Sequence, residues 1–188
     1  NPGDLSTAFE SVSDVATFAN SQSSGTSTNY GENGWYGSLE TLEPGKGYLL
    51  NMNAPGILTY PEFGLARLAE NKQPVELTKA TAGWEFNHAD YEFIGTITAS
   101  IENREDSDGD LIGVFVGDEC RGIAERMYFP LDDSYYYIIQ VYSNVIEGED
   151  LTFKYYDKLN DEVIEYTTET IEFTDNMVVG DGFNTMPL

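Results

Sequence analysis

Short strand-like segments follow one another from residue 91 to residue 173, and this regular succession constrains the fold more than any other feature. The segments are rich in aromatic and β-branched residues, which favour strands, and acidic turns separate them. Within residues 91–101, apolar side chains alternate with mostly polar ones, as in a strand with one buried face. The predicted strands cover residues 91–101, 111–117, 121–129, 135–142, 151–156, 163–168 and 170–173. This spacing predicts an antiparallel, immunoglobulin-like β-sandwich.

The start of the chain carries the only convincing helical pattern. Apolar side chains recur at helical spacing over residues 5–19, and either Asp4 or Thr7 is suited to cap the helix. Residues 21–33 are mostly Ser, Thr, Asn and Gly, which predicts a loop. We therefore expect one N-terminal helix followed by a polar connection.

A hairpin signal follows the loop. Residues 48–52 and 57–60 have strand-like composition, and the Asn-Ala-Pro-Gly sequence between them is typical of a turn. A polar stretch with a short helix over 65–70 then predicts a domain boundary. The expected protein is mainly β, with two small β-rich domains: residues 1–70 carry the helix and hairpin, and residues 71–188 form the sandwich.

The charge of the chain excludes several classes of partner. Nine Lys and Arg residues against 33 Asp and Glu residues give a net charge of −24. A surface of this sign repels phosphate backbones and anionic membranes, so no nucleic acid is expected as a partner. No apolar run approaches the length of a membrane span, so no membrane insertion is expected either. The acidic side chains serve either as a solvated coat or as a trap for divalent cations.

Two parts of the chain resemble modules that recur in large secreted and cell-surface bacterial proteins of the type IX-secreted kind. The run GWYGSLETLEPGKGYLLNMNAPGILTYP, at residues 34–61, resembles the first module, in which a helix precedes this segment. GDLIGVFVGDECRGIAE, at residues 109–125, and the strands after it resemble a companion module. The resemblance implies an exported pair of β-sandwich modules with an accessory or surface role and no catalytic residues.

One departure from the resembled module suggests how copies meet. The first module of that family usually opens with a strand before the helix, whereas here the helix pattern begins at residue 5. A missing strand leaves a sheet edge unpaired, and such an edge invites strand exchange between subunits.

The run Asp106-Ser107-Asp108-Gly109-Asp110 is the sharpest local motif. Carboxylates at alternate positions of a turn suit Ca²⁺, which takes six to eight oxygen ligands, so Asp106, Asp108 and Asp110 are candidate metal ligands and calcium is the candidate cofactor. The match to a complete calcium loop is poor, because Gly stands fourth instead of sixth and Gly117 occupies the place of the bidentate Glu. An acidic hairpin turn therefore remains the alternative.

No residue pattern predicts catalysis. Cys120 would need a nearby base to act as a nucleophile, and the one histidine, His88, lies far from it in the sequence. Cysteine is also among the residues most often buried, and Arg121 is expected to pair with Asp118 or Glu119. We therefore expect that the protein is not an enzyme.

The run Tyr135-Tyr136-Tyr137 is the candidate ligand-binding surface. Alternation along a strand places Tyr136 on the face opposite Tyr135 and Tyr137, so at least one face is expected outside the core or covered by a partner. Exposed aromatic rings suit stacking on sugars, and buried rings suit a small sandwich core. Both interpretations stay open.

The sequence as a whole favours an extracellular or cell-surface module that acts in adhesion or self-assembly. Its expected partners are other copies of the chain or other surface proteins. The alternative is a carbohydrate-binding accessory module of a secreted enzyme, which would bind polysaccharide through exposed rings.

Overall fold

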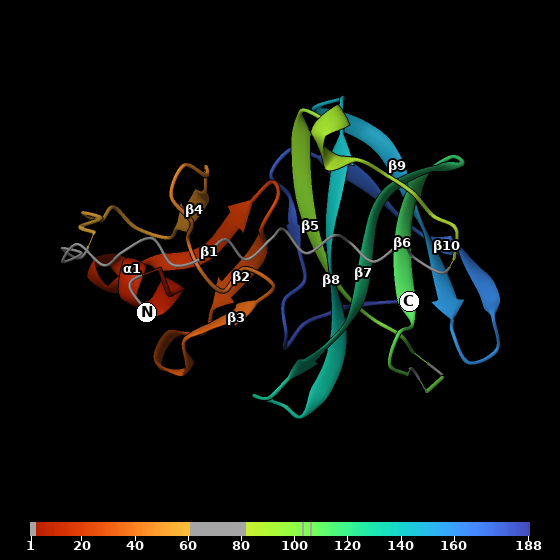
Figure 1. Cartoon of the computed structure of the whole chain (residues 1–188), viewed down its shortest axis with the longest axis horizontal. Helices are drawn as coiled ribbons and strands as arrows, with labels where there is room; N and C mark the ends of the chain where they lie inside the picture. Colours follow the sequence, from red (N-terminus) through yellow and green to blue (C-terminus); the bar gives the residue numbers. More distant parts are fainter. Residues whose placement is uncertain (1–2, 61–81, 103, 106) are drawn as a thin grey trace. The chain divides into compact units, whose positions relative to one another are not determined.

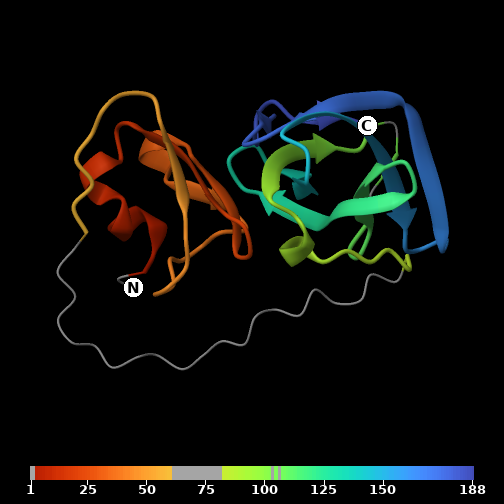
Figure 2. The same cartoon turned by 90° about the horizontal axis from the view of Figure 1, so that it is seen from above.

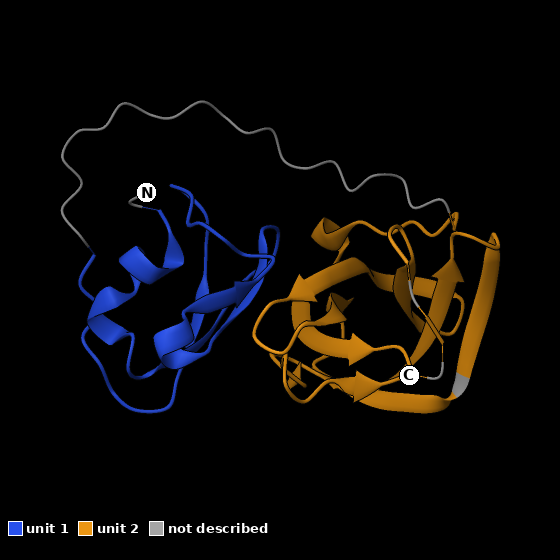
Figure 3. Ribbon diagram, turned by 90° about the horizontal axis from the view of Figure 1, so that it is seen from below, with its two compact units in different colours: residues 1–76 blue, residues 77–188 orange. Residues whose placement is uncertain are grey.

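The computed structural model describes residues 3–60, 82–102, 104–105 and 107–188 (Figure 1). The chain is mainly β, as predicted, and it divides into two compact units, Asn1–Glu76 and Leu77–Leu188, which Figure 3 colours separately. We call these the first and the second unit. The expected short helix over 65–70 and the expected boundary after residue 70 lie outside the described residues.

The first unit begins with the α-helix α1 (Leu5–Ala8), followed by the 3-10 turn η1 (Glu10–Val12). Asp4 caps α1, because its side chain accepts a hydrogen bond from the N–H of Ser6 at 3.0 Å. The helical segment buries its apolar side chains in a small core with the sheet of this unit. The buried members of that core are Leu5, Phe9, Val12, Ala16, Ala19 and Leu39.

The sheet of the first unit has four antiparallel strands in the order β3-β2-β1-β4. These strands are β1 (Ala16–Ser21), β2 (Gly25–Asn29), β3 (Trp35–Gly37) and β4 (Leu49–Met52), with the 3-10 turn η2 (Gly31–Asn33) before β3. Leu50 of β4 pairs with Ala19 of β1, and both contribute to the core of this unit. Among the residues that the structure describes, strand β4 therefore forms one edge of the sheet and β3 forms the other.

The predicted helix over 5–19 is right for its first half and wrong for its second half. The chain leaves helical conformation after Val12, and residues 16–21 form the central strand β1. Ser13 and Asp14 compete with helical hydrogen bonds through their short polar side chains, and Val15 and Thr17 are β-branched. Pairing with strands on both sides then overrides the helical spacing of the apolar residues.

Two further predictions for the first unit are corrected. The expected loop over 21–33 contains strand β2, which pairs with β1. The expected hairpin partner over 57–60 is not a strand, and β4 pairs with β1 instead. The 57–60 segment is held against the helical region, since the N–H of Thr59 donates to the hydroxyl of Ser11 at 2.8 Å. The turn composition before residue 57 therefore marks a change of direction without a hairpin.

The second unit is one continuous path of strands in the order β10-β9-β6-β7-β8-β5-β11, with β12 also paired to β5. The strands are β5 (Phe93–Ser100), β6 (Leu111–Val116), β7 (Glu119–Phe129), β8 (Ser134–Ser143), β9 (Glu147–Asp157), β10 (Glu162–Thr174), β11 (Val178–Val179) and β12 (Met186–Pro187), and the 3-10 turn η3 (His88–Asp90) precedes β5. The strands predicted over 163–168 and 170–173 form the single strand β10, which has an irregularity between Tyr166 and Ile171.

The path curls around a common interior, which Figure 2 shows from above. Strand β7 joins the two halves, because its first part pairs with β6 and its last part pairs with β8. Strands β11 and β12 pair with β5 in parallel, so the predicted antiparallel order holds for β5 to β10 but not at this edge. The buried core draws on both halves and includes Ile97, Ile112, Val114, Ile139, Val141, Leu151, Phe153 and Phe173.

Candidate functional site

We call the exposed apolar side chains of β4 and of residues 57–60 the β4 patch. Leu49 and Met52 of β4 are 51% and 36% exposed, and Ile57 and Tyr60, in the segment after it, are 83% and 57% exposed. Large apolar side chains gathered on one edge mark an interaction site more often than single exposed ones do. Among the described residues, only β1 pairs with β4, so the outer edge of this strand is available for a further strand.

The β4 patch is also free of charge. Residues 47–60 contain no Asp, Glu, Lys or Arg, and neither do strands β1 to β4. In contrast, the edge strand β10 of the second unit carries four glutamates, at positions 162, 165, 169 and 172. Charged side chains on an edge strand oppose pairing with another chain, and the β4 edge lacks this protection.

The acidic run at 106–110 is divided by the fold. Asp110 is 1% exposed and accepts hydrogen bonds from four donors: the N–H and hydroxyl of Ser107, the Tyr155 hydroxyl and the Lys158 N–H. Burial alone would raise the pKa of the Asp110 carboxyl, but the hydrogen bonds from Tyr155, Lys158 and Ser107 hold that pKa below its ordinary value. The hydrogen bonds of Asp110 therefore connect Ser107, in the loop before β6, to strand β9 and to the turn after β9.

Asp108, the second candidate metal ligand, has different surroundings from Asp110. The Asp108 side chain is 96% exposed and forms an ion pair with Arg126, and Asp106 lies outside the described residues. The part of the chain that the structure describes holds no group of three His, Cys, Asp or Glu side chains suited to a metal ion. A calcium site built from Asp106, Asp108 and Asp110 stays a prediction.

The three tyrosines of the predicted binding surface have different surroundings. Tyr136 and Tyr137 are 1% and 0% exposed, and Tyr135 is 46% exposed. Tyr135 lies opposite Tyr128, a residue that the sequence analysis did not single out, with ring centres 5.2 Å apart and planes tilted by 53°. The guanidinium of Arg126 lies over the Tyr135 ring at 4.1 Å. The exposed aromatic surface is thus a cross-strand pair of tyrosines, not a run along one strand.

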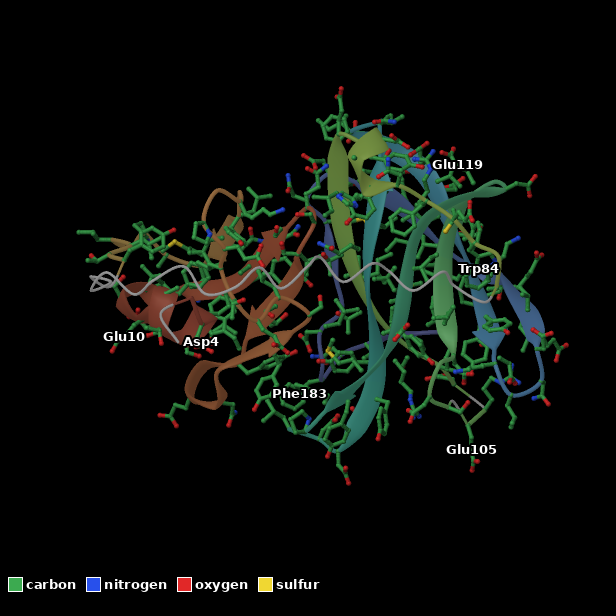
Figure 4. All side chains as sticks on the ribbon, viewed as in Figure 1. Asp4, Glu10, Trp84, Glu105, Glu119 and Phe183 are labelled. Carbon is green, nitrogen blue, oxygen red and sulfur yellow. The ribbon has the colours of Figure 1, made fainter. Side chains whose placement is uncertain are left out.

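A buried arginine, Arg121, contacts several residues at one end of the second unit. Arg121 donates to both carboxylate oxygens of Glu149, at 3.2 and 3.0 Å, and to the Tyr142 carbonyl. It also forms the expected ion pair with Glu119, at 3.3 Å, and lies over the ring of Tyr91. Figure 4 labels Glu119 at this end of the unit and Phe183 toward the other. These contacts stabilise the fold of this end of the unit.

The single cysteine and the single histidine take structural positions. Cys120 is buried, its thiol donates to the Gly122 carbonyl at 3.6 Å, and burial raises the pKa of that thiol. A raised thiol pKa opposes the thiolate that a nucleophile needs. The His88 ring packs near the Tyr142 ring, with centroids 6.2 Å apart. The geometry therefore gives neither residue a catalytic partner among its observed contacts.

The described residues include no helix that is both long and apolar enough to span a membrane. Of the features above, the β4 patch was missed by the sequence analysis, although its signal is visible as an uncharged apolar stretch in a strongly acidic chain. The comparisons with known proteins add no assignment. No protein-family model matches the chain, and no curated protein or solved structure matches it either.

Proposed function

We propose that this protein is a non-catalytic module that assembles with further copies of itself through the β4 edge of the first unit. The observation that carries the proposal is the uncharged edge strand β4, with the exposed apolar side chains of Leu49, Met52, Ile57 and Tyr60 on the strand and on the segment after it. A second β4 strand can add to this edge by main-chain hydrogen bonds, and the apolar side chains then bury one another.

The distribution of charge favours another copy of the chain as the partner that pairs with this edge. Two chains of net charge −24 repel each other over most of their surface. The repulsion is weakest where neither chain carries an acid, and the β4 edge meets that condition. Identical edges can pair antiparallel around a two-fold axis, which is the commonest symmetry of assemblies. Salt should promote association, because it screens the long-range repulsion.

The proposed test introduces a charge at the edge and the same charge elsewhere. Ile57→Glu places a carboxylate within the contact, and we expect it to weaken self-association by about tenfold or more, since burying an unpaired charge costs well over ~1.4 kcal/mol. Leu159→Glu is the matched control, because Leu159 is 84% exposed in the second unit and Ile57 is 83% exposed. Sedimentation velocity measures both variants; an equal effect, or none from Ile57→Glu, would rule out the β4 contact.

The setting that we propose is extracellular or at the cell surface, with a role in adhesion; filament-like assembly by strand exchange would need a second contact besides the two-fold β4 pairing. The resemblance to type IX-secreted modules and the acidic composition support this setting, and the resemblance also supports an immunoglobulin-like sandwich for the second unit. Bridging of acidic chains by calcium is part of the same proposal. Repeating the sedimentation experiment with a chelator tests it, and Asp108→Asn is the variant that should mimic the chelator.

Carbohydrate binding is the second candidate function, and the pair of exposed tyrosines, Tyr128 and Tyr135, favours it. Their rings are about half exposed, and aromatic faces stack on sugar rings. The 53° tilt prevents both rings from lying flat on one sugar, and Arg126 covers one face of Tyr135. This geometry supports a weaker, single-ring contact.

The tyrosine pair makes a prediction of its own. If the module binds polysaccharide here, Tyr135→Ala should lower the affinity for a bound polysaccharide about tenfold, since a well-placed ring contributes roughly 1–1.5 kcal/mol. Tyr60→Ala, which removes an exposed tyrosine of the first unit, should leave that affinity unchanged. Affinity electrophoresis in gels containing soluble polysaccharides gives the measurement, and absence of retardation for the unmodified chain removes this candidate.

A further inference from the structure

A small hollow opens on the first unit beside Trp35. It has a volume of about 240 Å³ and lies between the start of α1, strand β3 and residues 39–41. Trp35 lines it, together with Leu5 and Leu39, which are almost fully buried at 2% exposure each. Asp4 and Glu40 are the acidic residues of the lining. The hollow therefore combines an aromatic ring, an apolar lining and negative charge.

Local contacts hold the walls of this hollow in place. The Trp35 ring packs against the buried Phe9 ring, with centroids 5.4 Å apart. Asp4 caps α1 and forms an isolated β-bridge with Thr41, so the helix start is tied to the segment that contains Glu40. A site whose walls are fixed before binding loses less entropy when a ligand enters.

The residues that line the hollow favour an organic cation as its ligand. Both charged side chains that line it are acids, and the net charge of −24 adds a negative field around them. The face of Trp is the best aromatic partner for a cation. The volume lies below the 300–1,000 Å³ of drug-sized ligand sites, which excludes a long ligand.

We propose that the Trp35 hollow binds a primary ammonium group on an alkyl chain, such as the side chain of a lysine presented by another protein. The ammonium would lie near Asp4 and Glu40, and the alkyl stem would contact Trp35. This site is separate from the β4 edge and does not depend on self-association.

Fluorescence of Trp35 tests the proposal. In a Trp84→Phe variant, Trp35 is the only tryptophan, and its emission is followed during titration with N-acetyl-lysine methylamide or butylammonium chloride at constant ionic strength. We expect a saturable change with both probes at millimolar concentration, and no saturation with NaCl. The indole N–H signal of Trp35 in NMR spectra of the unmodified chain gives the same test without any substitution.

Substitutions of matched acids define the site. Glu40→Gln and Asp4→Asn should each weaken binding about threefold, because each removes one favourable charge, and Asn retains the helix cap. Glu10→Gln removes an exposed acid of the same unit that does not line the hollow, and it should change nothing. Figure 4 labels Asp4 and Glu10.

Three results would overturn the proposal. One is the absence of saturation with both ammonium probes, and another is an equal loss of affinity in Glu10→Gln. The third is equal saturation by uncharged methyl glucoside, which would make the hollow a sugar subsite. Saturation by both probes would support the proposal, and tighter binding of the lysine amide than of butylammonium would favour a lysine of another protein as the source of the cation.

Discussion

Replacement of Asp110 by alanine is expected to lower the free energy of unfolding by about 3–5 kcal/mol, one of the two largest effects that we predict for a single substitution. The buried carboxylate accepts hydrogen bonds from Ser107, Tyr155 and Lys158, at 2.5–3.2 Å. Its removal leaves these donors without their partner inside the protein. Chemical denaturation followed by circular dichroism measures the change.

The control for Asp110 lies two residues away. Asp108→Ala removes an almost fully exposed carboxylate, and exposed ion pairs contribute at most about 1 kcal/mol. The pH dependence should follow the lowered pKa of Asp110. Its stabilisation is present above the unfolded value of about 3.9 and is lost as pH falls through the lower folded value. An unchanged stability in Asp110→Ala would contradict this role.

Glu149→Ala is expected to lower the free energy of unfolding by about 3–5 kcal/mol, because it leaves the buried guanidinium of Arg121 without its main partner. Arg121 is 7% exposed, and both of its terminal nitrogens donate to Glu149. The hydroxyl of Ser143 loses an acceptor as well, since it donates to the same carboxylate at 2.5 Å. Thermal and chemical denaturation measure this loss.

A second variant and a control make the Glu149 prediction specific. Arg121→Leu combined with Glu149→Leu should recover much of the lost stability, because no unpaired charge remains buried. Glu165→Ala breaks the more exposed pair with Lys154, at 2.8 Å, and should cost less than about 1 kcal/mol. A double variant that is less stable than Glu149→Ala alone would show that the arginine is not the reason for the loss.

The strands of the second unit could be predicted from the sequence because their signal is local. Alternation over residues 91–101 and the acidic turns between segments mark the strands themselves, and the pairs β6-β7, β7-β8 and β9-β10 join neighbours in the sequence. The parallel pairing of β11 and β12 with β5 joins residues about 80 positions apart, and no local pattern encodes it. The two short strands themselves lack any alternation to detect.

The first unit was harder to predict because tertiary pairing decides its structure. The apolar residues of 5–19 fit a helix, yet β1 gains two strand partners by leaving that conformation. The polar strand β2 lacks large apolar residues, and its only β-branched residues, which favour strands, are Thr26 and Thr28. The uncharged stretch over 47–60, in contrast, was visible in the sequence and needed only the structure to show that it forms an exposed edge.

The candidate sites show why spacing alone does not define a binding site. Asp106, Asp108 and Asp110 alternate along the sequence, but Asp110 directly precedes the buried strand β6 and is drawn into the interior, whereas Asp108 faces solvent. The three adjacent tyrosines likewise divide into one exposed and two buried rings. The position of each residue relative to a strand end decides its exposure.

The molecular mass of the unmodified chain in solution tests the central claim most directly. Light scattering over a range of protein and salt concentrations, with negative-stain microscopy of the same samples, reports whether copies associate. We predict a mass that rises above the 20.9 kDa of one chain as protein or salt concentration increases. A mass of 20.9 kDa at every concentration and ionic strength would contradict self-assembly through the β4 edge.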